Sequence, residues 1–158
     1  MNLPPGREGE ERDRAWMELA LAEAEEAARE GEVPVGCLIV KGDRLLARAH
    51  NATERLGDPT AHAEMQAIRA ATALLGESRL RECELFVTLE PCFMCAGALV
   101  LARLDRVVYG ARDPKFGGCG SLWDIPSDRR VNHRVRLRGG VLAERAAKML
   151  KAFFQGRR

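Results

Sequence analysis

Apolar and polar residues follow two different rhythms at the start of the chain, and these predict a helix followed by a pair of strands. Residues 11–30 are rich in Ala, Glu and Leu and carry a weak stripe of 3.6-residue period that includes Trp16, which is typical of a helix. Residues 33–40 (VPVGCLIV) form a short apolar run typical of a buried strand. The turn Lys-Gly-Asp then leads into residues 44–50, so we expect an antiparallel hairpin.

The remaining chain alternates strands with helices, and this order predicts the fold class. A helix is expected over residues 62–75 with Thr60 as its N-cap, and another from Pro91, because proline suits a first helical turn. Further strands are expected over residues 84–89, 106–110 and 134–137, and a last helix over 143–154. The pattern predicts an α/β domain with a mixed sheet. We expect one domain over residues 11–158 and a flexible tail over residues 1–10.

Composition favours a soluble globular protein, since 46% of the 158 residues are hydrophobic and 30% are charged. The charged start of the chain lacks the apolar segment of a secretory signal. The longest apolar run, residues 92–102, is shorter than the roughly 20 residues of a membrane span. The odd count of five cysteines disfavours a disulfide framework. We therefore expect a cytoplasmic protein with reduced thiols and no membrane partner.

Charge is distributed unevenly along the chain. Residues 1–102 hold 11 Lys and Arg against 18 Asp and Glu, a balance of −7, whereas residues 103–158 hold 14 against 5, a balance of +9. This asymmetry indicates a face for an anionic partner, although basic residues scattered over a solvated surface would give the same counts. The chain end also places Phe153 and Phe154 beside two arginines. Aromatic stacking beside cations suits a nucleic acid, but the phenylalanines could instead anchor the last helix.

Two short segments carry residue types that bind and use a metal ion. Residues 60–68 (TAHAEMQAI) place His62 and Glu64 where a helix is expected to begin. The later segment TLEPCFMC places Cys92 and Cys95 three apart, on one face of a helix. In a first helical turn, unpaired N–H groups and the helix dipole favour thiolates. Two thiolates and an imidazole are suitable ligands for zinc.

Three interpretations of the cysteine pair compete. A redox dithiol has the same spacing, but it gives no role to the His-x-Glu segment. A structural zinc site needs a fourth protein ligand. The remaining candidates for that ligand, none at a customary spacing, are Cys37, Cys83, Cys119, His50 and His133. A catalytic zinc site, with His62, Cys92 and Cys95 as ligands, leaves the fourth position for water, and it is the interpretation that also uses Glu64.

Glu64 suits the acid–base chemistry of such a site. Two residues along a regular helix correspond to about 200° of rotation, so His62 and Glu64 converge only if His62 lies at the very first turn. A carboxylate beside a zinc-bound water can take its proton, and zinc lowers the pKa of that water from about 15.7 toward roughly 7. The order His-x-Glu…Pro-Cys-x-x-Cys matches the zinc deaminase signature in full. We therefore predict that Glu64 is catalytic.

The sequence resembles the bacterial tRNA-specific adenosine deaminases, within the cytidine deaminase superfamily, over nearly the whole chain. Three blocks are typical of the wider superfamily: residues 32–36 (EVPVG), 58–64 (DPTAHAE) and 88–98 (TLEPCFMCAGA). Four later blocks are specific to the tRNA enzymes: residues 107–115 (VVYGARDPK), 120–122 (GSL), 132–135 (NHRV) and 139–144 (GGVLAE).

The resemblance implies a three-layer αβα fold of the cytidine deaminase type with a five-stranded mixed sheet, a homodimer, and one Zn²⁺ per subunit held by His62, Cys92 and Cys95. It implies hydrolytic conversion of adenosine to inosine at the wobble position of a tRNA anticodon stem-loop, in an arginine tRNA, with release of ammonia. Glu64 would carry the proton from water to N1 of the base and then to the leaving amine. The implied pocket for the base comprises Val35, Asn51, Ala63, Glu90 and Pro91.

The resemblance also implies contacts with RNA. It places Asp113 near a ribose hydroxyl, from which a carboxylate can accept a hydrogen bond, and gives Lys115 and Asn132 contacts with the sugar–phosphate backbone. With the aromatic and basic end of the chain, the expected RNA-binding residues are Asp113, Lys115, Asn132, Phe154, Arg157 and Arg158.

One position departs from the family, and two other functions compete. Cys119 stands where the family usually has a small residue such as alanine, and we expect a small buried thiol there, as for Cys37 and Cys83. A free nucleobase or nucleotide deaminase acting on guanine or cytosine would need no basic face. An RNA-binding protein with a structural zinc would leave Glu64 without a role.

Overall fold

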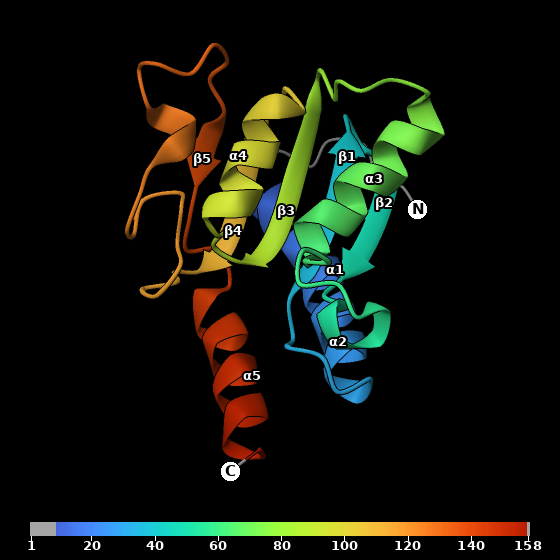
Figure 1. Ribbon diagram of the computed structural model, residues 1–158, viewed down its shortest axis with the longest axis vertical. Coiled ribbons are helices and arrows are strands. Elements are labelled where there is room, and N and C mark those ends of the chain that lie inside the picture. The colour runs from blue at the N-terminus through green and yellow to red at the C-terminus, as the bar shows by residue number, and fades with distance from the viewer. Residues whose placement is uncertain (1–8, 158) are drawn as a thin grey trace.

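Five strands form a mixed sheet in the order β2-β1-β3-β4-β5 (Figure 1). The computed structural model describes residues 9–157. The strands are β1 (Gly36–Lys41), β2 (Arg44–His50), β3 (Cys83–Leu89), β4 (Arg106–Ala111) and β5 (Arg136–Arg138). β1 pairs antiparallel with both β2 and β3, whereas β3 with β4 and β4 with β5 are parallel. The predicted hairpin and mixed sheet are confirmed.

Helices cover both faces of this sheet. They are α1 (Gly9–Arg29), α2 (Thr53–Leu56), α3 (Ala63–Leu75), α4 (Phe93–Leu101) and α5 (Ala143–Gln155), with a 3-10 turn η1 at Ile125–Ser127. In β1, Cys37 and Ile39 pack in the core beneath α3 and α4, and Leu38 and Val40 pack in the core beneath α1 and α5. This alternation between two apolar cores explains the continuous apolar run in the sequence and confirms the three-layer αβα fold.

α1 lies unusually close to β1, because Gly36 has no side chain. A Cβ atom at Gly36 would lie 1.9 Å from the carbonyl oxygen of Ala20 and 2.6 Å from the nitrogen of Ala24. Both distances are shorter than a van der Waals contact, so no residue with a side chain fits at this position. Trp16 on α1 is fully buried, with its ring 6.4 Å from that of Phe86 on β3. This packing fixes the start of β1, where the chain enters the region of the candidate site.

Both helices of the zinc signature begin later than predicted. α3 has His62 as its N-cap, not Thr60, because the N–H and hydroxyl of Thr60 bind the carboxylate of Asp58 at 2.8 and 2.7 Å. α4 begins at Phe93 with Cys92 as its N-cap. Pro91 therefore lies ahead of the helix rather than in its first turn.

Smaller boundary differences have local causes. α1 begins at Gly9, inside the expected tail, and residues 1–8 lie outside the described part of the chain. β1 starts at Gly36 rather than residue 33, because Val33 accepts the N–H of Val35 in a tight turn. β5 covers three residues, later than the expected 134–137.

The five cysteines are unpaired, and Cys37, Cys83 and Cys119 are buried as predicted. Among residues 9–157, the structure contains no helix with the length and apolar character needed to cross a membrane.

Candidate active site

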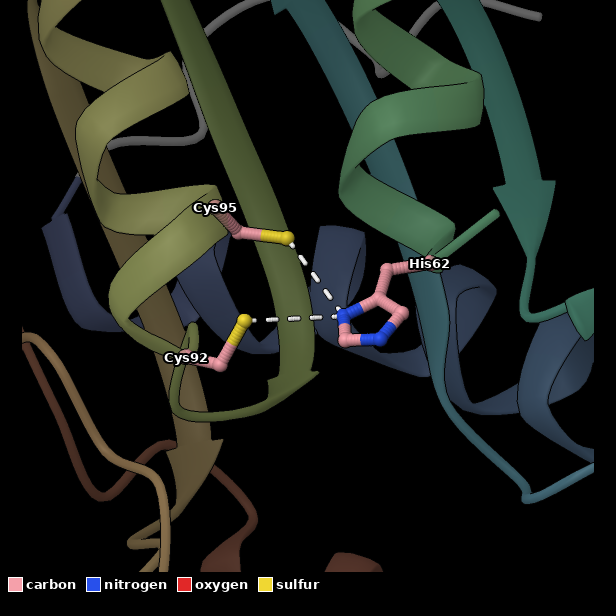
Figure 2. A group of neighbouring side chains, drawn as sticks. All are labelled: His62, Cys92 and Cys95. Atoms are coloured by element: carbon pink, nitrogen blue, oxygen red, sulfur yellow. Dashed lines mark hydrogen bonds between the residues drawn. The ribbon is translucent and has the colours of Figure 1, made fainter. Parts of the chain in front are cut away.

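The starts of α3 and α4 lie side by side and bring the signature residues together (Figure 2). His62 and Cys92 both occupy N-cap positions with extended backbone, at φ −70°, ψ 156° and φ −71°, ψ 174°. Neither side chain makes a capping hydrogen bond, so both point away from their helices and toward each other. Cys95 is the third residue of α4 and points to the same place (Figure 2).

The geometry of the three side chains fits a zinc ion. The Sγ atoms of Cys92 and Cys95 each lie 3.6 Å from Nδ1 of His62, and the three ligand atoms lie within 4.8 Å of one another. A tetrahedral ion with Zn–S near 2.3 Å and Zn–N near 2.0–2.1 Å places sulfur and nitrogen about 3.6 Å apart. Two soft thiolates and one imidazole are also the donor types that zinc prefers. The residues present therefore suit this ion.

Other potential ligands lie elsewhere. The rings of two further histidines are held by other groups: His50 bonds to Glu23 and Glu30, each at 3.1 Å, and His133 bonds to the carbonyl of Leu104 at 2.7 Å. Among the described residues, the cluster that could hold a metal contains three protein ligands. This favours an open site over the closed four-ligand site of a structural zinc.

The three candidate ligands differ in how readily they lose a proton. Hydrogen bonding to Cys95 and to His62 lowers the pKa of Cys92 to about 4 against the effect of burial, whereas the bond to Cys92 and burial raise the pKa of Cys95. The bond to Cys92 also raises the pKa of His62. Cys92 therefore offers a thiolate, and a cation that binds here would displace the protons of Cys95 and His62.

Glu64 lies two residues after His62 but in the same site. Because His62 is the N-cap and not a helical residue, the divergence of 200° expected on a regular helix does not apply. The side chain of Glu64 is 4% exposed, and burial raises its pKa to about 7. A carboxyl group with a pKa near the working pH is suited to accepting and releasing a proton.

A cavity of about 420 Å³ opens beside these side chains, which is within the usual range for a small-molecule site. The segments before β1 and after β2 supply one wall: Val33, Val35, Asn51, Thr53 and Pro59. The end of β3, the start of α4 and the loop after β4 supply another: Leu89, Glu90, Phe93, Met94, Asp113 and Phe116. His62, Ala63, Glu64 and Cys92 complete the lining. The size and lining suit one nucleobase with part of its sugar.

Sequence reasoning placed most of the pocket and missed some of it. Val35, Asn51, Ala63 and Glu90 line the cavity, whereas Pro91 is not among its described lining residues. The residues it missed are Val33, Thr53, Pro59, Leu89, Phe93, Met94 and Phe116. Phe93 and Met94 are the two residues between the signature cysteines, so their proximity to the site could have been inferred from their position in the sequence.

Sequence reasoning also missed the role of Glu32. This side chain is 1% exposed, and its carboxylate accepts the backbone N–H groups of Glu54 at 3.0 Å and Arg55 at 2.7 Å. These bonds hold α2, whose first residue, Thr53, lines the pocket together with Asn51. Its partners lie 22 and 23 residues along the chain, so no local signal in the sequence indicates this role.

The residues expected to contact RNA lie in three places. Asp113 lines the pocket, and Lys115 is exposed beside it. Asn132 lies beyond the far end of α4, where its side-chain oxygen accepts a hydrogen bond from Arg103 at 2.9 Å. The structure of one chain therefore does not bring Asn132 to the pocket.

The end of α5 provides the third place, and this helix projects past the edge of the sheet where β3 and β4 end (Figure 1). Phe154 is 53% exposed. Arg157 donates to the carbonyl of Gly31 at 2.7 Å and lies 4.3 Å over the ring of Phe153, so it docks α5 against the end of α1. Arg158 lies outside the described residues.

An αβα fold in which three convergent side chains could hold a metal ion beside a pocket lined by a buried carboxylate defines the class of cytidine-deaminase-like deaminases. Consistent with this, the family model of the MafB19-like deaminases matches residues 11–158. A tRNA-specific adenosine deaminase of Streptococcus pyogenes serotype M18 is 48% identical over 143 residues, which are 90% of each chain. A tRNA-specific adenosine deaminase of Aquifex aeolicus is 47% identical over 140 residues, 89% of this chain and 92% of its own.

Solved structures agree. A chain solved in work on A-to-I editing by tRNA:A34 deaminases superimposes with a TM-score of 0.83 and 43% identity, over 85% of this chain and 98% of that one. A guanine deaminase from Nitrosomonas europaea, at 24% identity and a TM-score of 0.69, shares the fold. The protein therefore belongs to the tRNA-specific adenosine deaminases.

Proposed function

We propose that the protein hydrolyses adenosine to inosine at the wobble position of a tRNA anticodon, in an arginine tRNA, and releases ammonia. The observation that carries the proposal is the convergence of His62, Cys92 and Cys95 beside a pocket that the buried Glu64 lines together with His62 and Cys92. Relatives at 46–48% identity that are tRNA-specific adenosine deaminases support the choice of substrate.

In this proposal His62, Cys92 and Cys95 hold one Zn²⁺. When bound, the ion would supply a Lewis acid that makes a water molecule acidic enough to ionise near neutral pH. The chain itself provides the ligand geometry, with sulfur and nitrogen atoms 3.6 Å apart at two helix starts.

Glu64 moves the protons. Its carboxylate accepts a proton from the attacking water and delivers it to N1 of adenine, while the water oxygen bonds to C6. The second proton of the water reaches the amino nitrogen through the same carboxylate, the C6–N bond breaks, and ammonia leaves. Adenosine and water thus give inosine and ammonia, and Glu64 ends in its starting state. Its burial keeps bulk water from competing for these protons.

The remaining pocket residues orient the nucleoside. Val35, 9% exposed, provides an apolar surface for the ring, and Asn51, 6% exposed, offers an amide that can bond to the polar edge of a base. The excess of basic residues after residue 102 supports an RNA substrate. We further propose a homodimer working in the cytoplasm, as the family resemblance implies.

Inosine formation in an arginine tRNA anticodon stem-loop, measured beside free adenosine, cytidine and guanine, tests the proposal. We expect inosine at the wobble position. Ammonia from a free base with the RNA unchanged would replace the proposed function by that of a free nucleobase or nucleotide deaminase.

The metal is tested by a matched pair of histidine variants. His62→Ala should lose bound zinc and activity, whereas His50→Ala, which alters a ring held by Glu23 and Glu30, should keep zinc at one ion per chain. Equal zinc contents in the two variants would refute His62 as a ligand.

A further inference from the structure

Glu90 lies in the pocket wall, and both oxygens of its carboxylate are occupied by the loop that follows β4. Its side chain is 1% exposed. Oε1 accepts the N–H of Asp113 at 3.1 Å and the hydroxyl of Ser121. Oε2 accepts the N–H groups of Cys119 at 3.1 Å and Ser121 at 3.0 Å. One buried carboxylate thus receives four hydrogen bonds from both ends of the loop, residues 113–121.

The middle of this loop is pressed against the start of α4. A Cβ atom at Gly117 would lie 2.3 Å from Oε2 of Glu90, and one at Gly118 would lie 2.9 Å from the Cα of Phe93. Gly118 also donates to the carbonyl of Pro91 at 2.8 Å. The glycines let the loop approach both the carboxylate and the segment that carries the Cys92 ligand.

The loop presents two residues to the cavity, Asp113 and Phe116. The side chain of Asp113 in turn accepts the N–H groups of Lys115 at 3.0 Å and Phe116 at 3.2 Å. The bonds therefore form a series: Glu90 fixes the backbone of Asp113, and Asp113 fixes the backbone of Phe116. Displacement of the Glu90 carboxylate would therefore shift both Asp113 and Phe116.

We propose that Glu90 is a positioning residue, whose carboxylate fixes the 113–121 loop so that Asp113 and Phe116 form the wall that receives the target nucleoside and the RNA next to it. This inference rests on the proposed function. It assigns to the side chain of Glu90 a role through the loop, in place of a direct contact with the base.

The four hydrogen bonds to Glu90 come from three backbone N–H groups and one hydroxyl. An N–H group can only donate, so both oxygens of the side chain must accept, as those of a carboxylate do. Glu90→Gln keeps the shape but introduces an NH₂ group. If that group replaces Oε2, it faces the N–H groups of Cys119 and Ser121; if it replaces Oε1, it can donate to the hydroxyl of Ser121, but it leaves the N–H of Asp113 unpaired. In either orientation at least one donor of the loop loses its acceptor. The less disruptive orientation places the NH₂ group at Oε1, and there the backbone of Asp113, which lines the pocket, loses its hydrogen bond to residue 90.

The test compares KM and kcat for inosine formation in the stem-loop, with zinc content and melting temperature measured on the same samples. We expect Glu90→Gln to raise KM by roughly 10-fold or more, because a displacement of 1 Å can cost about 100-fold, with one zinc per chain retained. Ser121→Ala, which removes one of four bonds, should raise KM by less. Asp13→Asn is the matched control: Asp13 is equally buried, at 1% exposed, but lies on α1 across the sheet.

A merely structural role would lower the folded fraction and hence the apparent kcat, with KM unchanged, as we expect for Asp13→Asn. The same result for Glu90→Gln would overturn the proposal. If Glu90→Gln does not fold, Ser121→Ala decides: an unchanged KM overturns the proposal, and a raised KM with normal zinc supports it. Absence of inosine with the wild-type protein would instead refute the proposed function, independently of Glu90.

Discussion

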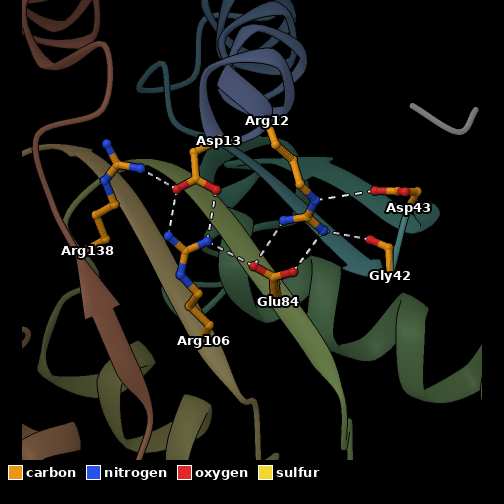
Figure 3. Close-up of polar contacts among 7 residues, drawn as sticks. All are labelled: Arg12, Asp13, Gly42, Asp43, Glu84, Arg106 and Arg138. Carbon is orange, nitrogen blue, oxygen red and sulfur yellow. Dashed lines mark hydrogen bonds and ion pairs between the residues drawn. The ribbon is translucent and has the colours of Figure 1, made fainter. Parts of the chain in front are cut away.

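Asp13→Asn tests how α1 is held to the sheet (Figure 3). The carboxylate of Asp13 accepts bonds from Arg106 on β4 at 2.8 and 2.6 Å and from Arg138 on β5 at 2.5 Å. Arg106 also bonds to Glu84 on β3 at 3.0 Å, and Glu84 pairs with Arg12 on α1 at 2.8 Å. The network thus ties one helix to three strands through charges at the edge of the core.

The expected loss of unfolding free energy in Asp13→Asn follows from the burial of the ion pairs. Removing one partner of a buried ion pair costs about 3–5 kcal/mol, because the remaining charge is left uncompensated. Here Arg106 keeps its ion pair with Glu84, and Arg106 and Arg138 are 18% and 33% exposed, so water can solvate them in part. We therefore expect the lower end, about 3 kcal/mol. For a chain of this size that corresponds to a fall in melting temperature of about 6–12 °C.

The effect should depend on pH. Burial alone would raise the pKa of Asp13, but hydrogen bonds with and attraction to Arg106 and Arg138 lower it below its ordinary value of 3.8. Because the unfolded chain then binds a proton before the folded one, this stabilisation is fully present above about pH 5 and is lost as pH falls through the folded pKa. The difference in stability between wild type and Asp13→Asn should therefore shrink in acid.

Urea unfolding at pH 7 and at about pH 3 measures the loss of unfolding free energy and its dependence on pH. Glu25→Gln, on the exposed side of α1, is the control and should change the unfolding free energy by less than about 0.5 kcal/mol. A loss for Asp13→Asn as small as this at pH 7 would refute the argument from burial, and a difference that grows in acid would refute the sign of the linkage.

Three other variants test the site and its surroundings. Glu64→Gln should lower kcat by at least about 100-fold with zinc retained, and near-normal turnover would remove Glu64 from the mechanism. Gly117→Ala, whose Cβ would lie 2.3 Å from Oε2 of Glu90, should raise KM, whereas Gly156→Ala, with ordinary contacts at 3.6 Å, should not; equal effects would argue against the crowded loop. Arg157→Ala should flatten the salt dependence of RNA binding, by about 0.7 in logarithmic slope for each phosphate that the chain no longer neutralises, and an unchanged slope with a lower melting temperature would assign Arg157 to docking α5 alone.

The sequence was sufficient for features whose causes are local. The turn Lys-Gly-Asp and the apolar run before it predict the hairpin, because a turn glycine and a continuous apolar run are visible within a few positions of the sequence. In the structure Gly42 has φ +61°. The metal-ligand cluster was predictable for the same reason, since His62 with Glu64 and Cys92 with Cys95 are close pairs at single helix starts. The two pairs are distant from each other in sequence, and the full signature implied that they meet in the fold.

Features with distant causes were not predictable. The partners of Glu90 are 23 to 31 residues away, and those of Glu32 are 22 and 23 residues away. Each glutamate alone is indistinguishable in sequence from a solvated charge. The N-cap of α3 was misplaced for a local reason. The hydroxyl of Thr60 can either cap a helix or bond to Asp58, two residues before it, and in the structure it bonds to Asp58.

The two N-caps show how the candidate site is linked to the stability of its helices. Ser, Thr, Asp and Asn are favoured at N-caps because their side chains bond to the first free N–H groups, and loss of such a cap costs about 1 kcal/mol. His62 and Cys92 occupy these positions in α3 and α4 without a capping bond. Both helices therefore forgo that stabilisation, and their starts depend instead on packing by buried residues such as Ala67 and Leu99. A metal ion bound by both N-cap side chains would connect the two helix starts, so metal binding and the local stability of α3 and α4 should be coupled.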